Sequence, residues 1–252
     1  MFFNSQSPIA NFPITIPPMS PLALVTGAAH RLGKVFALTL ARHGFDIVLH
    51  YHNSSDAALQ TKAELESVGS RVFLAQADLT QPAELQSLFS NIEYLQVLVN
   101  SAAFMPSGNV DLLSLENWDT SLDLNLRAPF LLAQEASKKM DNGGLIVNIT
   151  DVGAQKAWSR YPSYTVSKAA LESLTKILAR AFAPKIRVNA IAPGFVLPSE
   201  IVAVEEWQRL IDRVPLKRPA RTEEIASALE FLLLNEYITG QTIVVDGGYS
   251  LV

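Results

Sequence analysis

The chain contains no cysteine, few charged residues and no long apolar run, and each absence excludes a class of protein. Without cysteine it forms neither disulfides nor cysteine–metal sites, and we expect no metal. Charged residues make up 17% of the 252 residues, and the positive ones are scattered rather than gathered into the basic stripe typical of nucleic-acid binding. No apolar run reaches the roughly 20 residues that span a membrane. We therefore expect a cytoplasmic protein without nucleic-acid or membrane partners.

The first twenty residues differ in composition from the rest of the chain. They carry no charged side chain and hold Pro8, Pro13, Pro17 and Pro18, which disfavour a continuous apolar helix. No Lys or Arg precedes the apolar residues, as a signal peptide would require. We interpret residues 1–20 as a flexible N-terminal extension or an arm that packs on a neighbouring molecule, with Met19 as an alternative start.

The remaining residues, 21–252, alternate between short apolar runs and longer amphipathic stretches. Seven runs rich in Val, Ile and Leu predict strands buried on both faces of a parallel sheet: 22–25, 46–51, 71–76, 96–99, 145–150, 187–192 and 242–245. Six stretches between them predict helices: 32–42, 55–68, 82–91, 118–140, 163–182 and 223–234. The alternation predicts one α/β domain with a doubly wound, seven-stranded, Rossmann-type parallel sheet.

The residues that follow each predicted strand are the candidates for a site, because ligands bind beyond the carboxyl ends of such strands. The first strand leads into Thr26-Gly27-Ala28-Ala29-His30-Arg31-Leu32-Gly33. A glycine-bearing turn between a strand and a helix presents backbone N–H groups to a pyrophosphate. The position of this turn favours a dinucleotide over a plain strand–helix connection. The expected contacts are Gly27, His30, Arg31, Leu32 and Gly33.

The end of the second strand predicts which dinucleotide binds. NAD enzymes usually place an Asp or Glu there to bond the ribose 2′-hydroxyl, whereas this chain has His50-Tyr51-His52-Asn53-Ser54. An acid would repel a 2′-phosphate, while His, Asn and Ser donate to it. We therefore predict NADPH as the cofactor, with Tyr51, His52, Asn53 and Ser54 as contacts. His50 is equally well explained as a buried strand residue.

Two further strand ends carry candidate cofactor contacts. Asp78 and Leu79 follow the third strand, where they would meet the adenine ring. Asn100, Ser101 and Ala102 follow the fourth, where small residues let the backbone approach the cofactor. Tight packing alone would explain these small residues equally well.

Tyr164 and Lys168 form the candidate catalytic pair. Their spacing of four places them on one face of a predicted helix. We expect the neighbouring ammonium to favour the phenolate and to lower the pKa of Tyr164. A tyrosine tuned in this way acts as a general acid toward a substrate that accepts hydride. A pair with this spacing is commonly a surface pair, but its place after the strand that ends at Thr150 favours catalysis.

These motifs, in this order and spacing, resemble the short-chain dehydrogenase/reductase family over nearly the whole chain from about Leu22. The resemblance rests on Thr26-Gly27…Gly33, Asp78, Asn100, Asn125, Tyr164…Lys168, Pro193-Gly194 and Thr239-Gly240-Gln241…Val245-Asp246-Gly247-Gly248. It implies that Tyr164 is the general acid, that Lys168 holds the nicotinamide ribose and that Asn125 anchors a water in a proton relay.

The same resemblance implies a nicotinamide pocket and an assembly. Pro193, Gly194 and Val196 would line the nicotinamide pocket. The long helices at 118–140 and 163–182, together with the C-terminal segment, would form the interfaces of a homotetramer.

Asp151 departs from the family pattern. It stands thirteen residues before Tyr164, where the family has its catalytic serine. A serine hydroxyl donates to a carbonyl oxygen, whereas an ionised carboxylate only accepts and would repel a developing alkoxide. Asp151 therefore suits a substrate that is protonated at nitrogen. The alternative is that Thr150 replaces the serine and that Asp151 caps a loop.

Arg31 and Phe104 are further departures. Arg31 replaces the middle glycine of the first loop, where a side chain disfavours a positive φ, and it brings a cation near the pyrophosphate and the substrate. Phe104 would stack on a flat ring or, equally, pack in the core. With Asp151 and the His50-Tyr51-His52 strand end, these residues resemble the pteridine reductases and the dihydromonapterin or dihydrofolate reductases of this fold. In that group the aspartate works with the tyrosine in proton delivery, and the aromatic stacks on the pterin.

Three functions remain open at this point. The first is NADPH-dependent reduction of a pterin C=N bond, with Arg31, Phe104, Asp151 and Tyr164 at the substrate. The second is reduction of a ketone or a 3-oxoacyl group, and the third is a non-catalytic NADPH-binding sensor. We also expect residues 198–218 to form a lid over the substrate, on which Trp207 closes or simply packs.

Overall fold

The computed structural model describes residues 20–252 except 142 and 199–201, so the predicted extension at residues 1–20 lies outside the described residues apart from Ser20. Seven parallel strands form one sheet in the order β3-β2-β1-β4-β5-β6-β7. They are β1 (Leu22–Val25), β2 (Asp46–Tyr51), β3 (Val72–Gln76), β4 (Val97–Asn100), β5 (Gly144–Ile149), β6 (Ile186–Pro193) and β7 (Thr242–Val245). The predicted doubly wound parallel sheet is confirmed.

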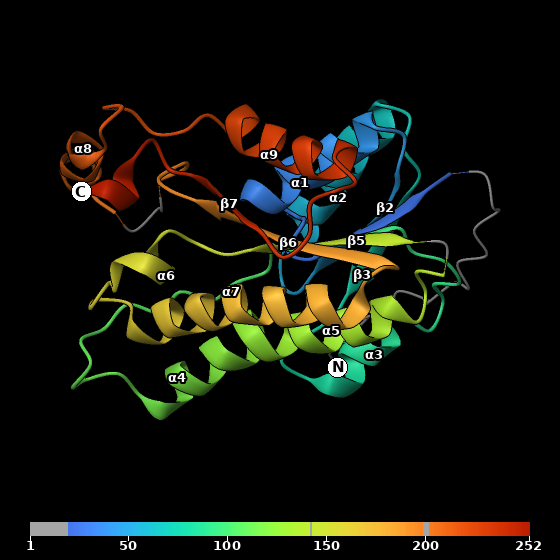
Figure 1. Ribbon diagram of the computed structural model, residues 1–252, viewed down its shortest axis with the longest axis horizontal. Helices are drawn as coiled ribbons and strands as arrows, with labels where there is room; N and C mark the ends of the chain where they lie inside the picture. Colours follow the sequence, from blue (N-terminus) through green and yellow to red (C-terminus); the bar gives the residue numbers. More distant parts are fainter. Residues whose placement is uncertain (1–19, 142, 199–201) are drawn as a thin grey trace, which may run out of the picture.

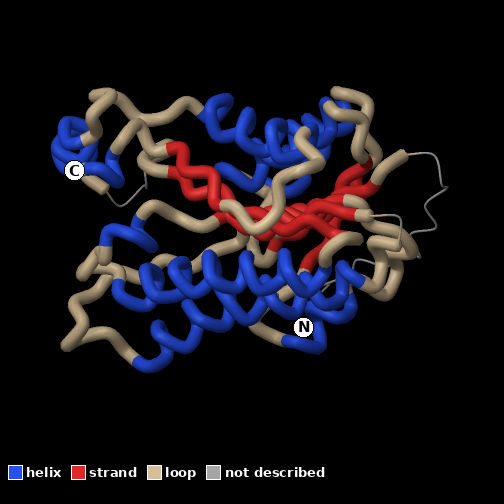
Figure 2. Tube along the Cα trace, in the orientation of Figure 1, coloured by secondary structure: helices blue, strands red, loops and turns tan. Residues whose placement is uncertain are grey.

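Helices cover both faces of the sheet and make three layers (Figures 1 and 2). One face carries α1 (Arg31–Arg42), α2 (Ser55–Ser67) and α9 (Thr222–Leu234). The other carries α3 (Pro82–Ser87), α4 (Leu115–Leu122), α5 (Ala128–Ser137) and α7 (Pro162–Phe182). Among the described residues, no helix is both long and apolar enough to cross a membrane.

The burial of the strands explains the absence of alternating polar residues in the sequence. Leu22 and Leu24 of β1 enter the core under α3, α5 and α7, while Ala23 and Val25 enter the core under α1 and α9. All four are at most 1% exposed. Because each fully buried Leu or Val side chain stabilises the fold by about 1.5–3 kcal/mol, both faces of the strand must be apolar.

The long helix predicted at 118–140 is present as a continuous helical stretch over residues 115–137, with a π-helical turn inside it that was not predicted. The stretch consists of α4, the π-helical turn at Asp123–Arg127 and then α5. Pro129 supplies the physical reason, because it has no N–H to donate to the carbonyl of Asn125 four residues earlier. The wider turn accommodates the missing backbone hydrogen bond, and it contains the buried Asn125.

Two short helices were not predicted from the sequence. α6 (Gly153–Lys156) follows β5, and α8 (Val204–Arg213) follows β6 within the expected lid. Both lie at one end of the molecule together with the C-terminal residues (Figure 1, left). A four-residue helix is too short to show a helical pattern in the sequence. α8 does carry apolar residues at helical spacing, at Val204, Trp207 and Ile211, so its signal was present but was assigned to a lid.

We predict that Gly33→Ala destabilises the protein far more than Gly69→Ala. A Cβ at Gly33 would lie 2.1 Å from the carbonyl oxygen of Gly27, so α1 would have to move away from the first loop. The expected loss is about 2–3 kcal/mol in the free energy of unfolding, measured by urea denaturation.

Gly69 is the matched control for this prediction. It has a φ of +92°, but a Cβ there would meet nothing within 4 Å. Gly69→Ala should therefore cost only the strain of the positive φ, about 1 kcal/mol. Equal losses for the two variants would mean that the contact between Gly33 and Gly27 does not constrain the fold.

Candidate active site

The first loop is held against the end of β4 by a buried threonine. The Oγ1 atom of Thr26 accepts hydrogen bonds from the backbone N–H groups of Ser101 (2.9 Å) and Ala102 (3.0 Å). A Cβ at Gly27, whose φ is +63°, would lie 3.0 Å from the Cα of Ala102. The small residues after β4 thus pack against the glycine loop, as the alternative interpretation of Ser101 and Ala102 held.

The N-terminus of α1 offers backbone donors to an anion. Among the residues that the structure describes, no side chain caps this end, and its first turn carries no acidic residue. His30 occupies the cap position and is exposed. The first N–H groups of a helix lack partners within the helix, and the helix dipole favours negative charge there. The local structure therefore fits the pyrophosphate of a dinucleotide.

Arg31 adopts the backbone conformation that its side chain was expected to disfavour. Its φ is +52°, in the left-handed region that glycine occupies easily, so Arg31 holds this conformation although its side chain disfavours it. Its guanidinium donates to the carbonyl oxygens of Leu197 and Pro198, each at 3.0 Å. The arginine side chain thus joins the first loop to the segment that follows β6.

His50, near the end of β2, supports the first loop through hydrogen bonds of its side chain. Its Nε2 lies 3.1 Å from the carbonyl oxygen of Ala77, which can only accept, so this nitrogen carries the proton. Its Nδ1 therefore accepts from the N–H of Gly27 at 3.2 Å. Burial lowers the pKa of His50 to about 4, which keeps the ring neutral in this role. The alternative interpretation of His50 as a buried strand residue is confirmed.

The other residues near the ends of β2 and β3 divide into exposed and buried groups. His52 and Asn53 are exposed and Ser54 is half-buried, whereas the side chain of Tyr51 packs in the core under α1. Leu79 is likewise buried.

Asp78 is half-buried, and its carboxylate faces its own loop. The Oδ1 atom of Asp78 accepts from the N–H and the hydroxyl of Thr80 at 2.9 and 2.8 Å. Of the residues predicted as cofactor contacts after β2 and β3, only His52, Asn53, Ser54 and Asp78 therefore have side chains that are exposed or half-buried.

Asn100 begins a buried polar chain through the sheet. Its Nδ2 donates to the Oδ1 of Asn148 on β5 at 2.8 Å, and the Nδ2 of Asn148 donates to the Oγ1 of Thr175 on α7 at 2.9 Å. All three residues are at most 3% exposed. The Oδ1 of Asn100 has no partner among the described residues. The two bonds between buried side chains fix the relative positions of β4, β5 and α7, which carry the site.

Tyr164 and Asp151 are in direct contact. The hydroxyl of Tyr164 donates to the Oδ2 of Asp151 at 2.9 Å, and the Oδ1 of Asp151 accepts from the N–H of Gly153 at 2.7 Å. The hydroxyl of Thr150 is buried and donates to the carbonyl of Ile191 instead. Asp151, not Thr150, therefore occupies the position opposite the tyrosine, although it also caps its loop.

Lys168 lies on the same face of α7 as Tyr164. Its Nζ is 5.6 Å from the centre of the tyrosine ring and donates to the carbonyl of Ile149 at 2.7 Å. The residue is 2% exposed. The predicted placement of the pair on one helix face is confirmed.

Asn125 and Ser167 hold the wall of the site. The side chain of Asn125 accepts from the N–H of Phe104 and donates to its carbonyl, both at 2.8 Å, and it also donates to the Oγ of Ser167 at 3.0 Å. Ser167 in turn donates to the carbonyl of Tyr164 at 2.7 Å. Both amide hydrogens of Asn125 are thereby engaged, so its predicted water would have to bond one of its oxygens. Ser167 carries no motif and could not be singled out from the sequence.

The segment after β6 packs against the C-terminal residues. Pro193 and Val196 are buried, and the N–H of Gly194 donates to the carbonyl of Val245 at 3.0 Å. A Cβ at Gly194 would lie 2.8 Å from the Cα of Asp246, so glycine is required for this approach.

An aromatic cluster that sequence reasoning missed lies beside these residues. Phe195 stacks on Trp158 (ring centres 6.4 Å apart) and also contacts Tyr249 (4.7 Å) and Trp207 (5.7 Å). Its members come from four separate segments, which sequence spacing cannot bring together. Trp207 packs edge-on against Phe195 in this structure, which fits the simpler of its two expected roles.

Comparisons with known proteins agree with this arrangement. The family model described as enoyl-(acyl carrier protein) reductase matches residues 27–250. The chain is 38% identical to the 1-cyclohexenylcarbonyl-CoA reductase of Streptomyces collinus, over 92% of this chain and 87% of the relative. It is 34% identical to the 3-oxoacyl-[acyl-carrier-protein] reductase of a Synechocystis species, over 90% and 96%.

Among solved structures, the FolM alternative dihydrofolate reductase 1 of Brucella canis, complexed with NADP, superposes with a TM-score of 0.86. It is 36% identical, and the match covers 92% of this chain and 94% of that chain. The chain belongs to the short-chain dehydrogenase/reductase family. It is therefore an oxidoreductase of that family.

The electrostatics of this short-chain reductase differ from expectation at Tyr164. Burial and the neighbouring carboxylate of Asp151 hold the pKa of Tyr164 well above its ordinary value, so the predicted lowering by Lys168 is wrong for the cofactor-free protein. Burial lowers the pKa of Lys168 to about 8 and raises the pKa of Asp151 to about 6. The tyrosine therefore stays protonated at neutral pH. The carboxyl group of Asp151 titrates about one pH unit below neutrality and the amine of Lys168 about one unit above it.

We predict that Asp151→Asn stabilises the cofactor-free protein. The pKa of Asp151 is raised to about 6 in the folded state, so the folded protein binds the proton more tightly than the unfolded chain. Stability then falls as the pH rises between about 4 and 6. The neutral asparagine avoids this loss, which by the shift is about 2–3 kcal/mol at pH 7.

The measurement is urea denaturation of both proteins at pH 4, 5, 6 and 7. The gain from Asp151→Asn should be largest at pH 7 and vanish near pH 4. Asp46→Asn is the control, because it breaks the pairing of the buried Asp46 with Arg71 and should lower stability instead. A gain from Asp151→Asn that does not depend on pH would contradict the raised pKa.

Proposed function

We propose that this protein is an NADPH-dependent reductase of a C=N bond in a reduced pterin ring, such as that of a dihydropterin or dihydrofolate. The observation that carries the proposal is the hydrogen bond from Tyr164 to Asp151. This carboxyl group, with its raised pKa, stands where a carbonyl reductase of the family needs a hydroxyl donor. The likeness to the dihydrofolate reductase of Brucella canis, at 36% identity, supports the same substrate class.

The cofactor is NADPH. The uncapped N-terminus of α1 suits the pyrophosphate, and His52, Asn53 and Ser54 at the end of β2 suit the 2′-phosphate. The similar reductase from Brucella canis was solved with NADP. Bound NADPH supplies the hydride, which would pass to a ring carbon of the substrate.

Proton delivery is the task of Tyr164 and Asp151. The C=N bond gains the hydride at carbon and needs one proton at nitrogen. Tyr164 is neutral and has one proton to donate, and a protonated Asp151 at 2.9 Å can replace that proton directly. Because the pKa of Asp151 is about 6, about one tenth of the carboxyl groups are protonated at pH 7. The buried ammonium of Lys168 stabilises the transient phenolate.

Phe104 is the side chain proposed to bind the flat ring. It is half-buried, and Asn125 holds both the N–H and the carbonyl of its peptide. Holding the backbone from both sides limits the positions that the aromatic ring adopts. Such a wall suits stacking on a planar heterocycle.

Reduction of an acyl thioester is the second candidate function. Its support is the identity of 34–38% with the 3-oxoacyl-[acyl-carrier-protein] reductase and the 1-cyclohexenylcarbonyl-CoA reductase. The site itself argues against carbonyl reduction. The hydroxyl of Thr150 donates to the carbonyl of Ile191, and the residue beside Tyr164 is Asp151, which has a carboxyl group instead of a hydroxyl. A carbonyl oxygen that becomes negative would meet the carboxylate of Asp151 at neutral pH.

The direct test is a substrate panel. Purified protein is incubated with NADPH and, separately, a dihydropterin, dihydrofolate, a 3-oxoacyl thioester, an enoyl thioester and small ketones, while oxidation of NADPH is followed by absorbance. We expect turnover with the dihydropterin or dihydrofolate. Turnover with thioesters or ketones alone would contradict the pterin assignment. Tight NADPH binding without any turnover would favour a non-catalytic NADPH-binding sensor.

We further predict that Asp151→Ser lowers kcat/KM for the pterin substrate by about a hundredfold, the range of one general acid–base group. In the unmodified protein kcat/KM should fall as the pH rises above about 6, because protonated Asp151 is depleted. The variant should lose this pH dependence and should gain activity toward ketones. An unchanged pterin rate in Asp151→Ser would remove Asp151 from the mechanism.

The homotetramer implied by the resemblance also stays a proposal. Its support is the exposure of large apolar side chains on α7, where Ile177 is 64% and Val166 is 45% exposed, and on the edge strand β7, where Val244 is 39% exposed. Mass measurement by light scattering at micromolar concentration should give about four times the 27.5 kDa of one chain. Replacement of Ile177 by Glu should reduce that mass.

A further inference from the structure

Arg31 combines an unfavourable backbone conformation with a long-range side-chain contact. Its φ of +52° lies where glycine would be free of strain. Its Nη1 donates to the carbonyl of Pro198 and its Nη2 to the carbonyl of Leu197, each at 3.0 Å. Ala157 and Lys217 also have positive φ values, so the inference depends on the contacts of the guanidinium and not on the backbone conformation alone.

The two carbonyls belong to the segment that leads from β6 toward α8. Phe195, two residues before Leu197, receives the edge of Trp207 from α8 at 5.7 Å between ring centres. The carbonyl of Phe195 also accepts from the N–H of Ala220 at 2.8 Å. Phe195 and Ala220, which flank the expected lid at residues 198–218, are therefore in contact.

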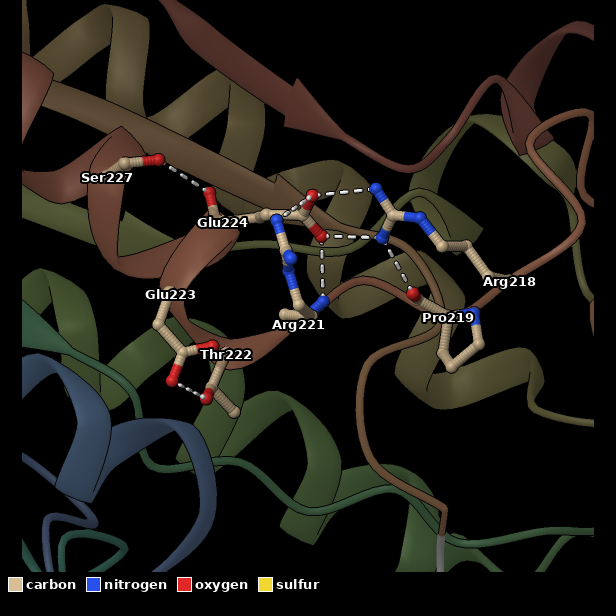
Figure 3. A network of polar contacts seen from close by, with 7 residues as sticks. All are labelled: Arg218, Pro219, Arg221, Thr222, Glu223, Glu224 and Ser227. Atoms are coloured by element: carbon tan, nitrogen blue, oxygen red, sulfur yellow. Dashed lines mark hydrogen bonds and ion pairs between the residues drawn. The ribbon is translucent and has the colours of Figure 1, made fainter.

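The far end of the lid has its own attachment to α9 (Figure 3). Arg218 donates to both carboxylate oxygens of Glu224 at 2.7 Å, and the N–H of Arg221 donates to the same carboxylate at 2.8 Å. These paired bonds hold Arg218 on the first turn of α9, which packs against α1 on one face of the sheet. The near end is held to the first loop by Arg31.

We propose that Arg31 is a positioning residue that fastens the start of the lid to the cofactor loop and so sets the affinity for the substrate. The planar guanidinium presents two parallel donors, which match two successive carbonyl oxygens. A lysine ammonium in the same place keeps the charge but lacks this fork. The role is separate from any contact of the cation with the cofactor phosphates, and it does not depend on which substrate the enzyme reduces.

The experiment compares Arg31→Lys and Arg31→Gly with the unmodified chain by hydrogen exchange of residues 202–214 in the cofactor-free protein. We expect exchange about tenfold faster in both variants, because the fork is lost in each. NADPH affinity of Arg31→Lys is measured alongside, from the fluorescence of the reduced nicotinamide. With the substrate found for the unmodified enzyme, Arg31→Lys should raise KM about tenfold, which is more than it changes NADPH affinity or kcat.

Lys34→Met is the matched control, because it removes a positive charge one turn further along α1 and contacts Glu64 rather than the lid. It should leave exchange at residues 202–214 unchanged. Unchanged exchange in both Arg31 variants, or an equal increase in Lys34→Met, would overturn the proposal. The exchange measurement uses no substrate, so its failure is distinguishable from failure of the pterin assignment.

Discussion

The hydrogen bond between Tyr164 and Asp151 is the interaction around which the site is organised. It joins the first turn of α7 to the residue that follows Thr150 at the end of β5, and it forms inside the protein, where charge is poorly solvated. Burial therefore raises the pKa of both groups rather than separating them into an acid and a base. The consequence is a pair in which Tyr164 keeps its proton at neutral pH, while Asp151 loses its proton only as the pH rises through about 6.

Buried polar contacts elsewhere bring the loops of the site to their places. The hydroxyl of Thr26 holds the N–H groups that follow β4, and the neutral ring of His50 bridges the first loop and the end of β3. Asn125 does the same for Phe104 from the other face of the sheet. Each contact satisfies backbone groups that would otherwise be buried without partners, so stability and site geometry depend on the same bonds.

Membership of the family does not determine the substrate, because the names of its relatives differ in the group that is reduced. What distinguishes this chain is a small number of side chains on the shared fold. Asp151 places a carboxyl group against the hydroxyl of Tyr164, Phe104 supplies a half-buried aromatic ring, and Arg31 connects the first loop to the segment after β6. These three residues lie on separate loops at one end of the sheet, so each could change without disturbing the strands that carry them.

The sequence by itself determined the seven-stranded parallel sheet and the placement of Tyr164 and Lys168 on one helix face, because these follow from local periodicity and from spacing along one helix. Asp151 was singled out by the resemblance to the family. The π-helical turn around Asn125 could have been predicted from Pro129, but the apolar pattern of residues 118–140 indicates only a regular helix. Only the tertiary structure decided the rest. The left-handed conformation of Arg31, the raised pKa of Tyr164 and the aromatic cluster around Phe195 arise from burial and from contacts between residues far apart in the chain. Spacing contains no information on such contacts, because dielectric environment and long-range proximity exist only once the chain has folded.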